Sequence, residues 1–370
     1  MDKRLLLASP HMSDEGYELK YIHDAFQKNW IAPLGENVNE FEKAMSEFMG
    51  EGYPVALSAG TAALHLSMIL AGVKSGDTVF CQSLTFSASA NPVTYCGAKP
   101  VFIDSERETW NMDPAALRRA FALHGTPKAV VVVHLYGNPA KLDEITAICR
   151  EHGVPLIEDA AEALGSTYNG QKCGTFGDFG ALSFNGNKII TTSGGGMLLC
   201  RTEDEAKHAL KLSTQARENA PWYQHEEIGY NYRMTNVQAC LGLAQLERLE
   251  GFIAHKKELY DHYVAALDGV KGLRILPFRE EECRSNHWFF SLYLKDSGLD
   301  RDTVIEKLQA QHIQTRPVWA LIHEQADYPR NEAYALDKAE DYRKYIVNLP
   351  CSTNLSMEDC ERVCQAVLAL

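Results

Sequence analysis

Residues able to bind a phosphorylated, ring-containing molecule occur in a fixed order in the first half of the chain. The first group is SAGTAA, residues 58–63, between an expected strand and an expected helix. The free N–H groups and the dipole of a helix start would receive a phosphate. Gly60 allows close approach of the backbone and Thr61 adds a hydroxyl donor. Read alone, the segment fits an ordinary capped turn better.

The next two groups place an aromatic ring and an acid at the ends of later strands. Phe86, in QSLTFSASAN, lies where ligands of α/β folds bind, and its flat ring could stack on a flat ligand or belong to the core. In VPLIEDAAEALGS a strand runs directly into Glu158 and Asp159. A carboxylate there could keep a pyridine nitrogen protonated, so that the ring withdraws electrons. The alternative is an acid that caps the next helix.

The fourth group, GALSFNGNKIITTSGGGMLLC, contains Ser183 and Lys188 between two expected strands. A lysine in a tight apolar connection is desolvated, which lowers its pKa and frees the amine for Schiff-base formation. Ser183 adds a hydroxyl to the phosphate site, whereas Lys188 read alone could be a solvated loop residue. Phosphate turn, aromatic ring, acid, serine and lysine together are the set needed to hold one pyridoxal phosphate (PLP). We therefore predict a PLP enzyme.

These residues require a sheet whose strand ends meet along one edge. Over about residues 15–200, short apolar runs without strict alternation are separated by helical segments, including one expected at SASANPVTYCG. This pattern predicts an α/β fold with a mostly parallel central sheet and helices on both faces. After a long helical stretch the pattern changes, with strands expected at HWFFSLYLKD and IQTRPVW. We predict a large domain at 1–250 and a smaller α+β domain at 251–370.

Charge and composition exclude several classes of partner. The net charge is −13, from 36 basic and 49 acidic residues, which disfavours nucleic acid and anionic membranes as partners. The apolar run LLLA near the start is too short for a signal peptide, and no stretch is long enough to span a membrane. The ten cysteines contain no CxxC pair, and Cys360 and Cys364, one helical turn apart, also suit buried packing. We expect a cytoplasmic protein with free thiols and no bound metal.

The sequence also resembles a known family over nearly its whole length. It is similar to the sugar-nucleotide aminotransferases of the DegT/DnrJ/EryC1/StrS group, which have the aspartate aminotransferase fold, fold type I of PLP enzymes. The similar segments include NWIAPLGENVNEFE, SAGTAALHL, FIDSERETWNMDP, HLYGNP, GYNYRMTNVQACLGL and NLPCS. EDAAEALGS and NGNKIITTSGGGML look closest to the branch that makes UDP-N-acetylbacillosamine-type 4-amino sugars. Such sugars feed protein glycans, lipopolysaccharide and nonulosonic acids.

The resemblance implies a role for each matching residue. Lys188 matches the Schiff-base lysine and Asp159 the acid on the pyridine nitrogen, and Asn231 matches an asparagine that reaches the phosphate from the neighbouring subunit of a homodimer. Glu162 stands where the family usually has Gln or His beside the ring hydroxyl, and Asn185 stands where many members have His. The remaining cofactor contacts implied are Gly60, Thr61, Ala62, Ser183 and the stacking ring of Phe86.

The resemblance implies transfer of an amino group from glutamate to the C4 ketone of a UDP-4-keto-6-deoxy-N-acetylhexosamine. Substrate contacts are expected from Trp30, Arg233, Arg316 and His323, with Lys20 and Trp319 as further candidates. The alternatives are action on another keto sugar nucleotide, a related PLP dehydratase, a non-catalytic paralogue and a nucleotide-dependent oxidoreductase. The dehydratase branch carries histidine at the position of Lys188, and no dinucleotide-binding fingerprint is present.

Overall fold

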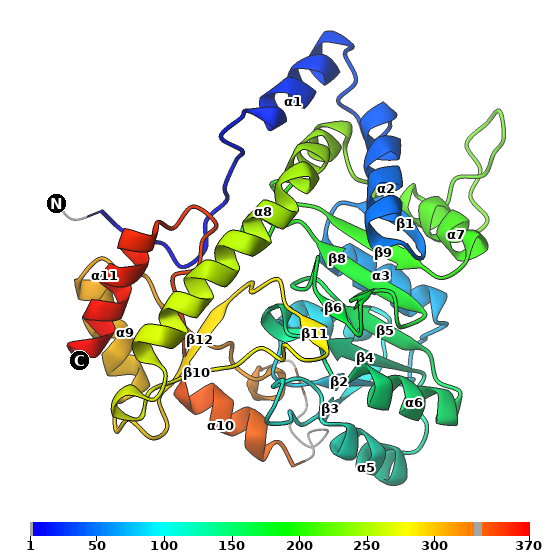
Figure 1. The fold of residues 1–370 in the computed structure, drawn as a ribbon. Coiled ribbons are helices and arrows are strands. Elements are labelled where there is room, and N and C mark those ends of the chain that lie inside the picture. The colour runs from blue at the N-terminus through cyan, green and yellow to red at the C-terminus, as the bar shows by residue number, and fades with distance from the viewer. Residues whose placement is uncertain (1–2, 327, 329–334) are drawn as a thin grey trace.

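A seven-stranded sheet forms the centre of the larger part of the molecule. The computed structural model describes residues 3–326, 328 and 335–370 (Figure 1). The strand order is β1-β9-β8-β5-β4-β2-β3, and β9 alone runs against the other strands of this sheet. The expected mostly parallel sheet is therefore confirmed. Its strands are β1 (Tyr53–Leu57), β2 (Thr78–Gln82), β3 (Lys99–Ile103), β4 (Ala129–Val133), β5 (Leu156–Asp159), β8 (Phe179–Ser183) and β9 (Gly196–Cys200).

Both faces of this sheet are covered, as the run AVVVV of β4 predicts. Val130 and Val132 pack into one apolar core with residues of α5 and α6, while Ala129 and Val131 pack into another with residues of α3. A strand buried on both faces needs no polar side chains, which explains its continuous apolar sequence. The helices of this part are α1 (Tyr17–Gln27), α2 (Glu36–Met49), α3 (Gly60–Leu70), α4 (Asn91–Tyr95), α5 (Pro114–His124), α6 (Leu142–His152) and α7 (Glu203–Ser213).

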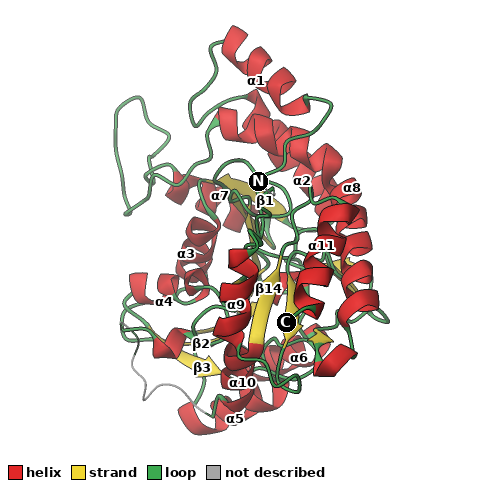
Figure 2. Ribbon diagram, turned by 90° about the vertical axis from the view of Figure 1, so that its left-hand side faces the viewer, coloured by secondary structure: helices red, strands yellow, loops and turns green. Residues whose placement is uncertain are grey.

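A smaller antiparallel sheet, of order β10-β12-β14-β13, lies in the C-terminal part of the chain. It comprises β10 (Arg274–Ile275), β12 (Phe290–Tyr293), β13 (Arg316–Pro317) and β14 (Ile346–Leu349), with α9 (Arg301–Ala310), α10 (Asp337–Tyr345) and α11 (Met357–Leu368) in the same part (Figure 2). A three-stranded ribbon joins β6 (Thr167–Tyr168), β7 (Gln171–Lys172) and β11 (Cys283–Arg284). Short 3-10 turns complete the elements: η1 (Ser87–Ser89), η2 (Leu135–Gly137), η3 (Val270–Gly272) and η4 (Ile322–Glu324).

The long helix α8 (Asn236–Leu267) connects the two parts (Figure 1). It begins with a capping box in which Thr235 and Gln238 exchange hydrogen bonds, as the sequence TNVQ favours. Residue 250 lies inside this helix, so the division into 1–250 and 251–370 stays a prediction. The N-terminal segment crosses that division, because the backbone of Leu5 forms a parallel bridge to Ile313.

Two expected elements differ in the structure. The segment SASANPVTYCG forms the turn η1 and the five-residue α4 instead of one helix, because Pro92 lacks the N–H that a continuing helix needs and permits only a new start. The strand expected at IQTRPVW is only the two-residue β13. All ten cysteines are free thiols, as expected. Among the described helices, none has both the length and the apolar character to cross a membrane.

Candidate active site

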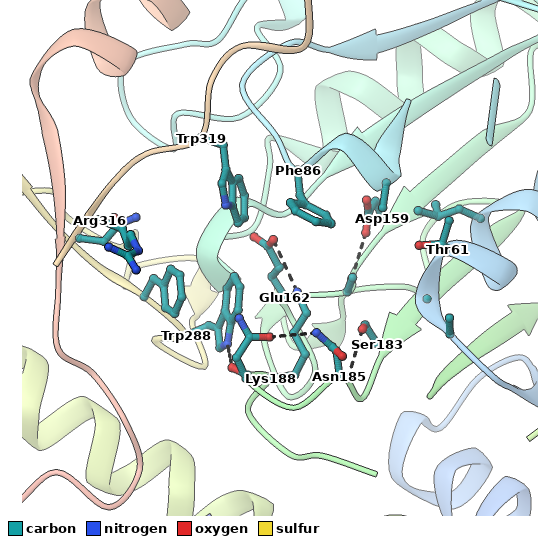
Figure 3. A pocket seen from close by; sticks show the side chains of 18 of the residues that line it. Thr61, Phe86, Asp159, Glu162, Ser183, Asn185, Lys188, Trp288, Arg316 and Trp319 are labelled. Atoms are coloured by element: carbon teal, nitrogen blue, oxygen red, sulfur yellow. Dashed lines mark hydrogen bonds and ion pairs between the residues drawn. The ribbon is translucent and has the colours of Figure 1, made fainter. Parts of the chain in front are cut away.

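A cavity of about 700 Å³ lies where strands of the large sheet end and the C-terminal part faces them (Figure 3). β1 leads into the start of α3, β5 ends at Asp159 and β8 ends at Ser183, so these strands deliver their polar residues to one edge. Arg316 and Trp319 line the opposite side. Of the residues expected from the sequence, the cavity brings together Gly60, Thr61, Phe86, Asp159, Glu162, Ser183, Asn185, Lys188, Arg316 and Trp319.

The first turn of α3 offers backbone donors toward the cavity. Ala62 and Ala63 donate the first hydrogen bonds of this turn, to the carbonyl of Ala59, so the N–H groups of Gly60 and Thr61 precede the helical ladder. No side chain caps this helix. A Cβ on Gly60 would lie 2.9 Å from Cβ of Ser183, so only glycine allows α3 to start this close to β8. These free N–H donors, the helix dipole and the hydroxyls of Thr61 and Ser183 form a phosphate cradle, a site suited to bind a phosphate group.

Asp159 is held at the buried end of β5. Its Oδ2 accepts a hydrogen bond from Ser89 Oγ at 2.6 Å and its Oδ1 accepts one from the N–H of Ala161 at 3.2 Å. Burial raises the pKa of Asp159 above its ordinary value, while the Ser89 hydrogen bond and the charge of Lys188 act in the opposite direction. The adjacent Glu158 points away from the cavity and accepts hydrogen bonds from the N–H groups of residues 174, 176 and 177. Strand alternation thus gives the two neighbouring acids different roles.

Lys188 lies in the connection between β8 and β9, and its side chain is only 12% exposed. Its Nζ is 4.0 Å from the centre of the Trp288 ring and 3.7 Å from Oε1 of Glu162. Burial lowers the pKa of Lys188, whereas the charges of Glu162 and Asp159 raise it. An amine with a lowered pKa is a nucleophile, as Schiff-base formation requires.

Glu162 is a buried carboxyl whose ionisation is costly. Its Oε2 accepts a hydrogen bond from the N–H of Tyr136 at 2.7 Å. Burial raises the pKa of Glu162 to about 7, although the nearby charge of Lys188 acts against that shift. Near neutral pH this side chain therefore exchanges between a neutral and a charged form beside the lysine.

Comparisons with known proteins agree with this geometry. The model of the DegT/DnrJ/EryC1/StrS aminotransferase family matches residues 13–368. The chain belongs to this family. EpsN of Bacillus subtilis (strain 168), whose name describes a pyridoxal phosphate-dependent aminotransferase, is 46% identical over 100% of this chain and 96% of its own length. The GDP-perosamine synthase of Caulobacter vibrioides is 38% identical over 98% of this chain and 97% of its own.

A solved structure shows the same fold. The aminotransferase TlmJ from Streptoalloteichus hindustanus superposes with a TM-score of 0.92 at 32% identity, covering 99% of this chain and 98% of TlmJ. The family membership and these relatives make the protein a PLP-dependent sugar aminotransferase with the fold of PLP aminotransferases. The cavity fits the cofactor of the DegT/DnrJ/EryC1/StrS family, because it combines unused helix-start donors, a buried carboxyl and a desolvated amine.

Several cavity residues of this family member escaped the sequence analysis. Trp288 lies against Lys188 and donates through Nε1 to the carbonyl of Asn187 at 2.7 Å. Phe289 stacks on Trp288 with ring centres 4.0 Å apart. Arg343, from α10, also lines the cavity. The run HWFF, residues 287–290, was the only sequence signal for Trp288 and Phe289, and its apolar character predicts no more than a buried strand.

Not every expected residue reaches the cavity of its own chain. Ala62 is buried in α3 behind the phosphate cradle. Arg233 pairs with Glu42 and donates to the carbonyl of Ala56, so its guanidinium is engaged within the fold and does not face the cavity. His323 contacts Ser83 Oγ through Nδ1 at 2.8 Å. The other residues outside the cavity lining are Lys20, Trp30 and Asn231.

Proposed function

We propose that this enzyme transfers the amino group of glutamate to the C4 ketone of a UDP-4-keto-6-deoxy-N-acetylhexosamine. The observation that carries the reaction class is the desolvated Lys188 amine in one cavity with the Asp159 carboxyl and the free donors of α3. The similarity of EDAAEALGS and NGNKIITTSGGGML to the bacillosamine-type branch supports the UDP sugar.

In the proposed mechanism, PLP supplies an electron-withdrawing ring and carries the amino group between the two substrates. With PLP bound, the Lys188 amine would act as general base and then as general acid for the proton on the donor α carbon. Burial lowers the pKa of Lys188, which favours the unprotonated amine that a general base needs. Asp159, which is fixed by the hydrogen bond from Ser89, would hold a proton on the ring nitrogen of the cofactor.

The C-terminal side of the cavity supports binding of the nucleotide sugar. Arg316 is exposed and lines the cavity with Trp319, whose ring centre lies 5.5 Å from that of Phe86. A guanidinium binds diphosphate oxygens through paired hydrogen bonds, and exposed rings stack on sugar or base. Arg343 adds a second cation to this lining.

A GDP-linked keto sugar is the second candidate. It rests on the 38% identity to a protein named GDP-perosamine synthase. The cavity residues named above suit a diphosphate, which UDP and GDP sugars share, and do not distinguish uracil from guanine. Activity must therefore be compared between the UDP-linked and the GDP-linked keto sugar to decide the substrate class.

A homodimer with shared sites forms part of the proposal. Asn231 lies outside the cavity of its own chain, in a bridge to Thr214, next to a loop that exposes Trp222, Tyr223 and Ile228. Large exposed apolar side chains of this kind mark interfaces. A second copy would cover the loop and receive Asn231 at its phosphate site. Ten free thiols also fit a reducing compartment, which supports the cytoplasm as its location.

The decisive experiment follows the two half-reactions separately. The PLP-loaded protein is mixed with glutamate, and the loss of the visible cofactor band and the release of 2-oxoglutarate are measured. The aminated enzyme is then offered UDP-4-keto-6-deoxy-N-acetylglucosamine or the GDP-linked counterpart, and the product is identified by mass spectrometry and NMR. Preference for the UDP sugar supports the proposal, preference for the GDP sugar replaces its substrate, and no amino transfer to either rejects it.

The shared site has its own test. Lys188→Ala and Asn231→Ala variants are purified, mixed under conditions that exchange subunits, and assayed together. Mixed dimers contain one intact site if Asn231 acts across the interface, so activity returns above that of either variant alone. Activity that stays at the sum of the two variants would contradict a shared site.

A further inference from the structure

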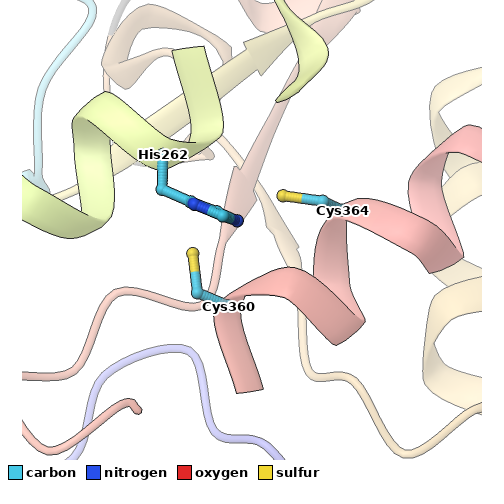
Figure 4. Close-up of side chains that lie close together, drawn as sticks. All are labelled: His262, Cys360 and Cys364. Atoms are coloured by element: carbon cyan, nitrogen blue, oxygen red, sulfur yellow. The ribbon is translucent and has the colours of Figure 1, made fainter. Parts of the chain in front are cut away.

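A cluster of soft metal-binding side chains lies away from the cavity. His262 of α8 and Cys360 and Cys364 of α11 present three potential ligand atoms, all within 4.8 Å of one another (Figure 4). None of these three residues lines the active-site cavity. Within the described part of the chain, this is the one group of three such residues with this spacing.

The fold, not the spacing of the cysteines, creates this cluster. Residues four apart lie on one face of a helix, so both thiols of α11 point to the same neighbour. Both cysteines are fully buried against α8, and the Cys360 thiol lies 3.9 Å from the carbonyl of Leu259. His262 lies one turn further along α8 and brings a nitrogen that no sequence pattern connected to the cysteines.

Glu361 lies beside His262 at the open edge of the cluster. Its Oε2 lies 2.8 Å from Nε2 of His262. The side chains of His262 and Glu361 are 30% and 46% exposed, so an ion can enter from solvent although the sulfurs are buried. Two thiols, an imidazole and a carboxylate are four groups, which is the number that a tetrahedral site requires.

We propose that His262, Cys360, Glu361 and Cys364 form a Zn²⁺ site that fastens α11 to α8. Thiolate and imidazole ligands favour zinc over magnesium or calcium. Ligand atoms around tetrahedral zinc lie roughly 3–4 Å apart, given bonds of about 2.0–2.3 Å. The present spacing of up to 4.8 Å exceeds that value, so the proposal requires the side chains to move together when zinc binds.

A metal at this position stabilises the C-terminal part without taking part in amino transfer. α8 runs from the large sheet to the C-terminal sheet, and α11 packs on it with Val363 and Val367 in the shared core. Binding to the folded chain and not to the unfolded one raises stability by mass action. The effect of zinc therefore appears in unfolding and leaves turnover unchanged.

The test measures metal content and stability of the PLP-loaded protein. After equilibration with Zn²⁺ and removal of unbound metal, we expect one zinc per chain, a higher unfolding temperature, and thiolate-to-metal charge-transfer bands when Co²⁺ replaces zinc. Cys360→Ala/Cys364→Ala should abolish all three. His262→Ala changes a partly exposed residue and should weaken zinc binding by on the order of 100-fold or more while the chain stays folded.

The matched control is Cys81→Ala/Cys149→Ala, which removes two other buried thiols and should retain zinc. Wild-type protein without zinc, or cobalt binding without charge-transfer bands, would overturn the proposal. Equal zinc content in wild type, His262→Ala and the Cys360/Cys364 double variant would overturn it as well, because the metal would then bind elsewhere.

Discussion

The two walls of the active-site cavity are built differently. The sheet wall consists of Gly60, Asp159, Ser183 and Lys188, at strand ends or in their tight connections. The C-terminal wall consists of Trp288, Arg316, Trp319 and Arg343, placed by two-residue strands, loops and a helix.

Regular strands fix the sheet wall, so its residues are buried or half-buried and their order in the sequence indicates their positions. The C-terminal wall depends on how separate segments meet, and Arg316 is exposed. We therefore expect the sheet wall to carry the residues for cofactor binding and proton transfer. We expect the C-terminal wall to carry the residues that select the substrate. The following variants test that division.

Lys188→Ala should have the largest effect. Removal of the amine that binds the cofactor and moves the proton should lower turnover by at least about 10⁴-fold in both half-reactions. The measurement is single-turnover absorbance with glutamate and, separately, with the keto sugar. Lys172→Ala, outside the cavity, serves as the control and should keep full activity. Retention of activity by Lys188→Ala would remove the proposed mechanism.

Asp159→Asn should follow, with a loss of about 10²–10³-fold, because an amide cannot balance a protonated ring nitrogen. The adjacent Glu158→Gln is the matched control. It breaks hydrogen bonds to backbone N–H groups on the other side of β5 and should lower the free energy of unfolding by about 2 kcal/mol. The cofactor spectrum of that control should not change. Similar spectra for both variants would contradict the distinct roles of the two acids.

Arg316→Met tests the C-terminal wall. Loss of a charged hydrogen bond to the diphosphate should raise KM for the nucleotide sugar about 10-fold or more, with the glutamate half-reaction unaffected. Steady-state kinetics at varied nucleotide sugar gives the answer. Arg118→Met, which loses only a surface ion pair with Glu151, is the control. An equal effect on the glutamate half-reaction would show that this wall does not separate the substrates.

Glu162→Gln should have the smallest effect of the four variants. Its effect is on the rate at which the apoprotein takes up PLP, and the size of that effect depends on pH. As the pH rises through about 7, Glu162 loses its proton, and the resulting charge raises the pKa of Lys188. The amide carries no charge, so Lys188 should be deprotonated at lower pH and the apoprotein should take up PLP a few-fold faster near neutral pH. The rate of PLP uptake against pH measures this. Coincident profiles for variant and wild type would exclude the coupling.

The sequence predicted the sheet wall because strand ends meet at one edge, so order along the chain translates into proximity. It could not predict Trp288 or Arg343, since their positions depend on packing between segments far apart in sequence. Arg233 was expected as a cation and His323 as a histidine on the substrate side, but Arg233 pairs with Glu42 and His323 contacts Ser83. Pro92 shows a smaller error, where apolar spacing suggested one helix and the missing N–H divided it.

The N-terminal segment has a consequence for biosynthesis. The N–H of Leu5 donates to His312, the carbonyl of Leu7 accepts from Cys351, and Ser9 donates to Ser352, 343 residues later in the chain. A ribosome therefore releases this segment long before its partners exist, and the segment must wait unpaired while the large sheet forms. We expect the C-terminal part to close last, around a segment made earlier, so delayed translation prolongs the time for which residues 5–9 lack their partners.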